Sequence, residues 1–325
     1  MELRKVQQTN SGTFFVSLPK DWAQHVGLDK GTVVAVASIN GRLCLDPQYD
    51  TERKPLSGVL KPTPYLSREI VGKYLLGYDV IHVETKNRIS PAERALVKQT
   101  SDRLVGLEIV EEDYARIVLE CLLEPAASSP EKILKREYNI VASMHRDAVS
   151  ALLEGDEHLA KNVIARDFEA NRFYFLLVRT LRTIIQSPNL GEKLGVRSID
   201  CLDYRLCASL VEAIGDRAVE VAYKSLALRS VEVSKDTSQL MSKLHSLAFK
   251  AQEKAVRAFF GHNVALAEEV RNERARMETL LHDIESVAKK QTTDVVPLVL
   301  AAASSLYRIF GHSVDIADLV MPKEL

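Results

Sequence analysis

Cysteine is scarce in this sequence, with four residues among 325: Cys44, Cys121, Cys201 and Cys207. Their spacings match no zinc motif and each lies in an apolar stretch, so we expect small buried side chains in a reducing compartment. Long hydrophobic runs are also missing, because the longest, residues 295–303, contains Pro297 and is too short to cross a bilayer. The N-terminus lacks the apolar segment of a signal peptide. These absences predict a cytoplasmic protein without membrane insertion.

An excess of one charge is absent as well, since 43 Lys and Arg residues face 44 Asp and Glu residues. DNA binding would therefore have to come from a local basic patch. The motifs GxxxxGK[ST] and GxSxG are missing, and the eight histidines form no recognisable metal pair or catalytic triad. We predict that the protein is not an enzyme. Its length, with 46% hydrophobic and 27% charged residues, favours two or three globular domains.

The first zone, residues 1–47, contains short strand patterns separated by turn residues. Strands are expected at residues 14–18, 32–37 and 42–45, with a short helix at 20–26 and a hairpin turn at Asn40-Gly41. Phe14, Phe15 and Trp22 are expected to lie in its core. Since so few apolar side chains make a thin core, we expect two copies of this zone to dimerise.

The second zone, residues 64–124, mixes helix and strand patterns and is predicted to be a small α+β connector. Proline-rich linkers are expected on both sides, at residues 46–63 and 125–130. Ser90 followed by Pro91 has the pattern of an N-cap and a first helical turn. The expected elements are helices at 66–77 and from 90 onward, and strands at 78–83, 107–110 and 117–123.

The third zone, residues 131–325, has apolar residues at three- and four-residue steps throughout, which predicts helices. Six long ones are expected, at about 131–154, 156–186, 196–229, 236–260, 263–289 and 294–320. Residues 147–163 align without gaps with 254–270, and 214–222 resemble 309–317. This repeat predicts two tandem three-helix units, 131–230 and 236–320. The alternative is that amphipathic helices share alanine and leucine by chance.

Two family resemblances follow from these patterns. Residues 156–163, 167–172, 174–179 and 214–220 resemble the phosphate-uptake-regulator (PhoU) fold. Residues 4–6, 16–20, Trp22 and 27–31 look like an AbrB/SpoVT-type swapped-hairpin domain. The combination is similar to AbrB-plus-PhoU regulators found mainly in archaea. It implies a multidomain α+β protein with an N-terminal swapped-hairpin β module, a small α+β connector and C-terminal all-α tandem three-helix bundles.

A metal site is one hypothesis for the first helical unit. Asp167 and Asn171 share one helix face, and Asp216 and Glu220 share another, so their oxygen atoms can converge if the helices are neighbours. Such ligands suit magnesium, manganese or iron, and the PhoU resemblance implies this role. Asn171 stands where that family has an acid. The aligned residues of the second unit include Arg274 and Gly311, so no metal is expected there. The alternative is an ordinary solvated helix face.

A DNA-binding surface is the second hypothesis. Phosphate contact requires cations and polar groups near loops. The first zone offers Arg4, Lys5, Gln7, Thr9, Asn10, Ser11 and Lys20. The alternative is that this zone only dimerises.

Three functions are compatible with these features. The leading one is a phosphate-linked transcriptional regulator, in which a hairpin dimer binds DNA and the PhoU-like helices sense metal, phosphate status or a partner. The alternative is a cytosolic adaptor that binds a phosphate transporter ATPase or a sensor kinase without DNA contact. The third is a metal-storage or scaffold bundle.

Overall fold

The computed structural model describes residues 2–39, 41–47, 55–124, 127–229, 231 and 233–322. Contacts divide the chain into two compact units, Met1–Pro55 and Leu56–Leu325. Asn40 of the expected hairpin turn, and residues 48–54 and 125–126 of the two expected linkers, lie outside the described residues.

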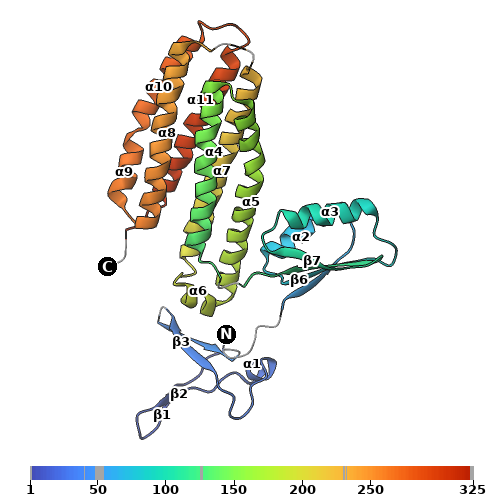
Figure 1. Ribbon diagram of the computed structural model, residues 1–325. Helices are drawn as coiled ribbons and strands as arrows, with labels where there is room; N and C mark the ends of the chain where they lie inside the picture. The colour runs from blue at the N-terminus through green and yellow to red at the C-terminus, as the bar shows by residue number, and fades with distance from the viewer. Residues whose placement is uncertain are drawn as a thin grey trace. The chain divides into compact units, whose positions relative to one another are not determined.

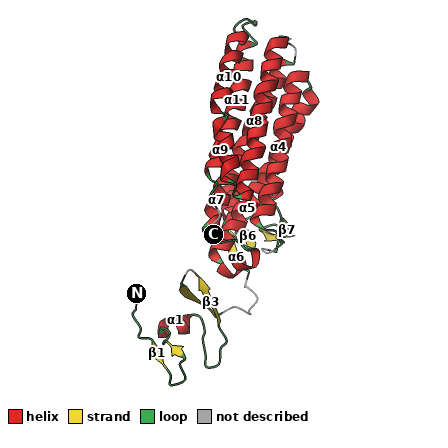
Figure 2. Cartoon of the chain, turned by 90° about the vertical axis from the view of Figure 1, so that its left-hand side faces the viewer, coloured by secondary structure: helices red, strands yellow, loops and turns green. Residues whose placement is uncertain are grey.

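The first unit consists of two antiparallel strand pairs and one short helix (Figure 2). In the first pair, Gln7 lies opposite Phe15, and Gly12 in the connecting turn has φ +88°, a conformation that favours glycine. The predicted strand-rich character of this zone is confirmed. The elements are β1(Gln7–Gln8), β2(Phe14–Phe15), α1(Lys20–His25), β3(Ala35–Ile39) and β4(Arg42–Asp46).

Among its described side chains, this first unit has no buried residue. Phe14 is 69% exposed and Phe15 49% exposed, so the prediction that they form a core is wrong for a single chain. Cys44 is also exposed, contrary to its predicted burial. Other exposed apolar side chains are Leu3, Val6, Val16, Val33, Val36 and Leu43.

The second unit begins with a four-stranded sheet in the order β5-β6-β8-β7. β5(Ser57–Leu60) pairs in parallel with β6(Val80–Glu84), and the other neighbours, β8(Arg116–Cys121) and β7(Leu107–Glu112), pair antiparallel. α2(Leu66–Leu75) and α3(Pro91–Asp102) pack on the sheet through a shared buried cluster (Figure 1). The cluster includes Leu66, Ile70, Tyr74, Ile81, Val83, Val97, Ile117 and Leu119.

In the connector, the predicted helix cap at Ser90 is present, and one strand was not predicted. Ser90 caps α3 as predicted, because its Oγ accepts a hydrogen bond from Glu93 N while the Glu93 carboxylate accepts one from Ser90 N. β5 was missed, since it lies in the segment predicted as a linker, between Pro55 and Pro62. A strand of four residues gains its stability from pairing with β6, which the sequence alone does not reveal.

The rest of the second unit is helical (Figure 1). The predicted fifth helix is divided at Glu273, and a short extra helix fills the predicted break after residue 186. Side chains of Ser129, Asp156, Ser234 and Asn263 cap four of the helices, and Gly155 ends the first in the left-handed conformation. The helices are α4(Pro130–Glu154), α5(Glu157–Gln186), α6(Pro188–Leu194), α7(Asp200–Leu228), α8(Lys235–Gly261), α9(Val264–Asn272), α10(Arg274–Ala288) and α11(Val296–Asp318).

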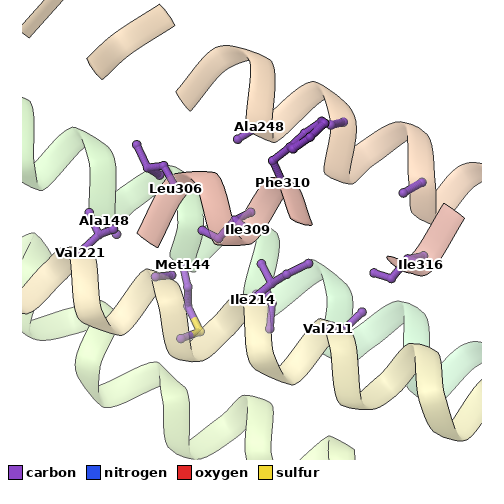
Figure 3. Packing of buried hydrophobic residues seen from close by; sticks show 14 of the residues in the cluster. Met144, Ala148, Val211, Ile214, Val221, Ala248, Leu306, Ile309, Phe310 and Ile316 are labelled. Atoms are coloured by element: carbon purple, nitrogen blue, oxygen red, sulfur yellow. The ribbon is translucent and has the colours of Figure 1, made fainter. Parts of the chain in front are cut away.

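One hydrophobic core runs through all of these long helices. Figure 3 shows Leu306, Ile309 and Phe310 of α11 among residues of α4, α7 and α8. α4 contacts α8, and α7 contacts α11. These are like-to-like contacts between corresponding helices of the predicted repeat, which a twofold relation between duplicated units produces.

The connector and the helices are joined by a buried arginine. Arg179 of α5 donates hydrogen bonds to the carbonyl oxygens of Tyr74 at 2.7 Å and Tyr78 at 2.8 Å, and its guanidinium lies 3.3 Å from Asp79. Phe175, one turn earlier, packs against the connector core. Among the described residues, no helix is long and apolar enough to cross a membrane.

Candidate functional site

Two of the predicted metal residues lie at the seam between the neighbouring helices α5 and α7. Asp167 belongs to α5 and Asp216 to α7. The charge of Asp216 raises the pKa of Asp167, and the charges of both raise the pKa of Glu212. The structure adds Glu212, one turn before Asp216 on the same face of α7. The three carboxylates therefore form an acidic seam, which we define as Asp167, Glu212 and Asp216.

The protonation of this acidic seam is set by burial and by mutual repulsion. Burial raises the pKa of Glu212 to about 7, and the charges of Asp216 and Asp167 add to the effect, while Arg205 opposes it. Burial and the Asp216 charge also raise the pKa of Asp167. Partial loss of hydration raises the pKa of Asp216. The seam thus accumulates negative charge as the pH rises, which favours a cation nearby.

The other two predicted ligands are occupied by protein groups. Asn171 Nδ2 donates a hydrogen bond to Asp167 Oδ2 at 2.9 Å, so its amide nitrogen and not its oxygen points at the seam. Glu220 accepts from Arg217 at 2.6 Å and from Ser305 at 2.8 Å. Over the described ranges, no group of three or more His, Cys, Asp or Glu side chains is arranged to hold a metal ion. The four predicted residues therefore do not form a ready-made metal centre.

Glu212 was missed by the sequence reasoning, although a signal was present. Glu212, Asp216 and Glu220 follow one another at four-residue steps and so lie on one face of α7. The step from Asp216 back to Glu212 is the same as the step forward to Glu220.

The predicted DNA-binding residues are all exposed. Gln7 lies in β1, and Thr9, Asn10 and Ser11 form the tip of the β1–β2 hairpin. Thr9 Oγ1 lies 2.8 Å from Ser11 Oγ and accepts a hydrogen bond from Thr13 N at 3.1 Å, so this tip is braced by its own hydroxyls. The structure therefore groups these four residues in one hairpin.

The three basic members are placed separately. Arg4 and Lys5 precede β1, and Lys20 begins α1. Arg4 pairs with Glu2, which neutralises part of the local positive charge. The basic contribution of this surface in one chain is therefore small.

Comparisons with known proteins concern the helical part. A family model described as PhoU domain matches residues 134–224 and 241–320, which together exceed half of the chain. The two matches start at aligned positions of the internal repeat, since Asp147 aligns with Lys254 and residue 134 therefore aligns with 241. No curated protein matches the sequence.

Two solved structures share the fold. PhoU from Pseudomonas aeruginosa is 21% identical, with a TM-score of 0.52 over 59% of this chain and 93% of that one. The phosphate transport system regulatory protein PhoU from Streptococcus pneumoniae is 14% identical, with a TM-score of 0.53 over 60% of this chain and 96% of that one. At these identities the likeness describes the fold.

Proposed function

The chain belongs to the PhoU domain family, and from this premise we propose that it is a cytosolic adaptor regulating phosphate transport, which binds a transporter ATPase or a sensor kinase. The single observation that carries the proposal is the pair of PhoU matches on one continuous helical core. One of the similar structures is itself named a phosphate transport system regulatory protein. In this reading the helical surfaces bind partners and the chain performs no chemistry.

Direct binding tests the adaptor role. The purified full-length chain is titrated against the phosphate transporter ATPase subunit and the sensor kinase of its own organism, and phosphate uptake is measured after deletion of its gene. We expect saturable binding to one partner and altered uptake that the full chain restores. Absence of binding to both, with unchanged uptake, would overturn the proposal.

A second candidate is DNA binding by a dimer of the first unit, as in the AbrB/SpoVT-type and archaeal resemblance. The observation that favours a dimer is the set of exposed apolar side chains among the described residues of this unit, which a second copy would cover. Two copies would double the exposed hairpins. This candidate retains the predicted division into residues 1–47, 64–124 and 131–325.

Salt dependence tests the DNA candidate. If the hairpins contact phosphates, affinity falls steeply as salt rises, and Arg4→Ala with Lys5→Ala weakens binding. Equal mobility shifts for the parent and the double variant would remove this surface.

Metal binding at the acidic seam stays a third, separate proposal. Asp167, Asp216 and the added Glu212 supply hard oxygen donors, whereas Asn171 and Glu220 must first release their protein partners. Divalent metal content is measured in the parent and in Asp167→Ala and Asp216→Ala. Lower content in both variants supports the site, and equal content removes it.

A further inference from the structure

A groove of about 460 Å³ lies between α8 and α10 in the second helical unit. It adjoins Glu273, where α9 ends and α10 begins. The first unit has the uninterrupted helix α5 at the corresponding place, because Val163 aligns with Val270 and Arg166 therefore aligns with Glu273. The groove thus lies beside a helix break in the second unit, and the first unit has a continuous helix at the aligned position.

Cations predominate along this groove. Lys243, Lys250 and Lys254 line it from α8, and Arg276 lines it from α10, against the single acid Glu273. Lys254 pairs with Glu269 at 2.8 Å, and Arg276 lies 3.6 Å from Glu273. Lys243 and Lys250 are exposed and, within the described part of the chain, take part in no ion pair. The groove therefore carries two positive charges that the protein leaves unneutralised.

The floor of the groove is apolar. Leu247 and Ala251 of α8 and Val270 of α9 are buried beneath the lysine row, and Leu280 of α10 is half-buried beside them. A basic edge beside an apolar floor complements a ligand that has an acidic edge beside an apolar face.

The duplicate in the first unit shows that the fold does not require this arrangement. Lys250 aligns with Ser143 and Lys254 with Asp147. There, Arg166 donates a hydrogen bond to Ser143 Oγ at 2.9 Å and pairs with Asp147, so the space is crossed by an internal network. Lys243 has a cationic counterpart in Arg136, which lines a groove of about 600 Å³ in the first unit, so the part of the lysine row that is particular to the second unit is Lys250 and Lys254.

We propose that this groove binds an acidic amphipathic helix of a partner protein, with carboxylates at Lys243 and Lys250 and apolar side chains on Leu247 and Leu280. The row from Lys243 to Lys254 extends about 16 Å at 1.5 Å per residue, three helical turns, which suits a helical segment better than a single phosphate. Exposed ion pairs contribute little each, so the lysines act together with the half-buried Leu280 and mainly select the partner. The inference rests on the adaptor role proposed above and identifies the kind of segment it binds.

Fluorescence anisotropy with the full-length chain tests the groove. The probe is a labelled synthetic helix with glutamates along one edge and leucines on the adjacent face, and a scrambled peptide of the same composition is its control. We expect saturable binding that weakens with salt and is reduced about tenfold by Lys243→Glu with Lys250→Glu. The matched variant Lys86→Glu with Lys98→Glu makes the same charge change at exposed sites of the connector and is expected to bind like the parent.

The inference would be overturned by no binding of the probe, by equal binding of the scrambled peptide, or by equal binding to the Lys243/Lys250 variant. Displacement of both peptides by pyrophosphate, dependent on the same lysines, would assign the groove to small anions instead. The adaptor role fails separately. If the Lys243/Lys250 variant still binds whichever of the two, transporter ATPase or sensor kinase, the parent binds, and as tightly, then the groove proposal is wrong and the adaptor role stands.

Discussion

His145 Nδ1 lies 2.8 Å from Gln252 Oε1, and these two residues hold equivalent positions in the two helical units. Asp147 aligns with Lys254, so the residues two positions earlier are repeat partners. Because the amide oxygen only accepts, Nδ1 of His145 donates, and its Nε2 accepts from His245 Nδ1 at 3.2 Å. The duplicated units therefore meet between α4 and α8 through a buried polar chain.

This chain predicts acid sensitivity. Burial lowers the pKa of His145 to about 3 and that of His245 to about 4, from the ordinary 6.5, so both are neutral in the folded protein. A lowered folded pKa gives stability that is present above pH 6.5 and is lost as the pH falls toward about 4 and then 3. His145→Asn removes one of these titrations. We expect it to be destabilised by about 1–3 kcal/mol at pH 7, because it loses buried contacts.

The difference in free energy of unfolding between the parent and His145→Asn should then become smaller below pH 6.5, by up to about 1.4 kcal/mol per pH unit. Denaturant unfolding at several pH values measures it. His158 is exposed, so His158→Asn is the control, and its difference in free energy of unfolding from the parent should not change with pH. A gap for His145→Asn that stays constant from pH 7 to 5 contradicts the assignment.

Glu137 is predicted to cost stability at neutral pH. It is fully buried on α4, neither carboxylate oxygen has a hydrogen-bond partner among the described residues, and burial raises its pKa well above the ordinary value, with Glu212 adding to the rise. A raised folded pKa gives stability that is full below the unfolded value and is lost as the pH rises. The stability of Glu137→Gln relative to the parent should therefore increase from about pH 4.5 upward, by up to about 1.4 kcal/mol of unfolding free energy per pH unit.

Thermal and denaturant unfolding of Glu137→Gln between pH 4 and 8 check this expectation. The exposed Glu154→Gln carries the same chemical change and should stay parallel to the parent. If the stability of Glu137→Gln relative to the parent decreases as the pH rises, the sign is opposite to the prediction and the buried-acid interpretation is wrong.

The helical half of the fold was predictable because its signals are local. Apolar periodicity located the long helices, and the gapless alignment of two segments revealed the duplication that the two family matches also show. The break at Glu273 was not predictable, because no glycine or proline lies there and the surrounding residues favour helix. Both α9 and α10 contact α8 and α11, and these contacts between distant segments are not visible in the sequence.

The candidate site was predictable in its helix faces and not in its contacts. Spacing placed Asp167 and Asp216 on the faces that meet, yet it gave no sign that Asn171 donates to Asp167 or that Ser305 of α11 holds Glu220. The Asn171–Asp167 contact depends on side-chain rotamers, and the Ser305–Glu220 contact depends on a helix that is distant in sequence. Exposure of the first unit was also hidden, since composition does not tell which molecule covers an apolar side chain.

Arg179 is predicted to hold the connector on the helices. Its side chain is 8% exposed, and it serves two carbonyl oxygens and Asp79 at once. Arg179→Met removes a buried cation and its hydrogen bonds to Tyr74 O and Tyr78 O, and should cost about 3 kcal/mol. Arg179→Lys should recover only part of this, because an ammonium group lacks the planar fork.

Limited proteolysis separates a local from a global effect of this change. We expect faster cleavage within residues 56–124 of Arg179→Met, while the helical fragment stays intact. The exposed neighbour Arg182→Met is the control and should cleave like the parent. Unchanged cleavage of Arg179→Met would show that the connector is held by its apolar contacts alone.

Val36 provides the sharpest test of dimerisation by the first unit. It is 59% exposed in the single chain, the same fraction as Val59 in the second unit, so Val36→Glu and Val59→Glu are matched in residue type, charge and exposure. If a second copy covers Val36, losing about 1.5 kcal/mol of burial on each copy weakens the dimer by about 3 kcal/mol, more than a hundredfold. Sedimentation velocity across micromolar concentrations should therefore show Val36→Glu as a monomer and Val59→Glu as a dimer like the parent. A parent that is monomeric throughout this range, or two variants that dissociate equally, would mean that the exposed apolar side chains of the first unit are covered by something other than a second copy.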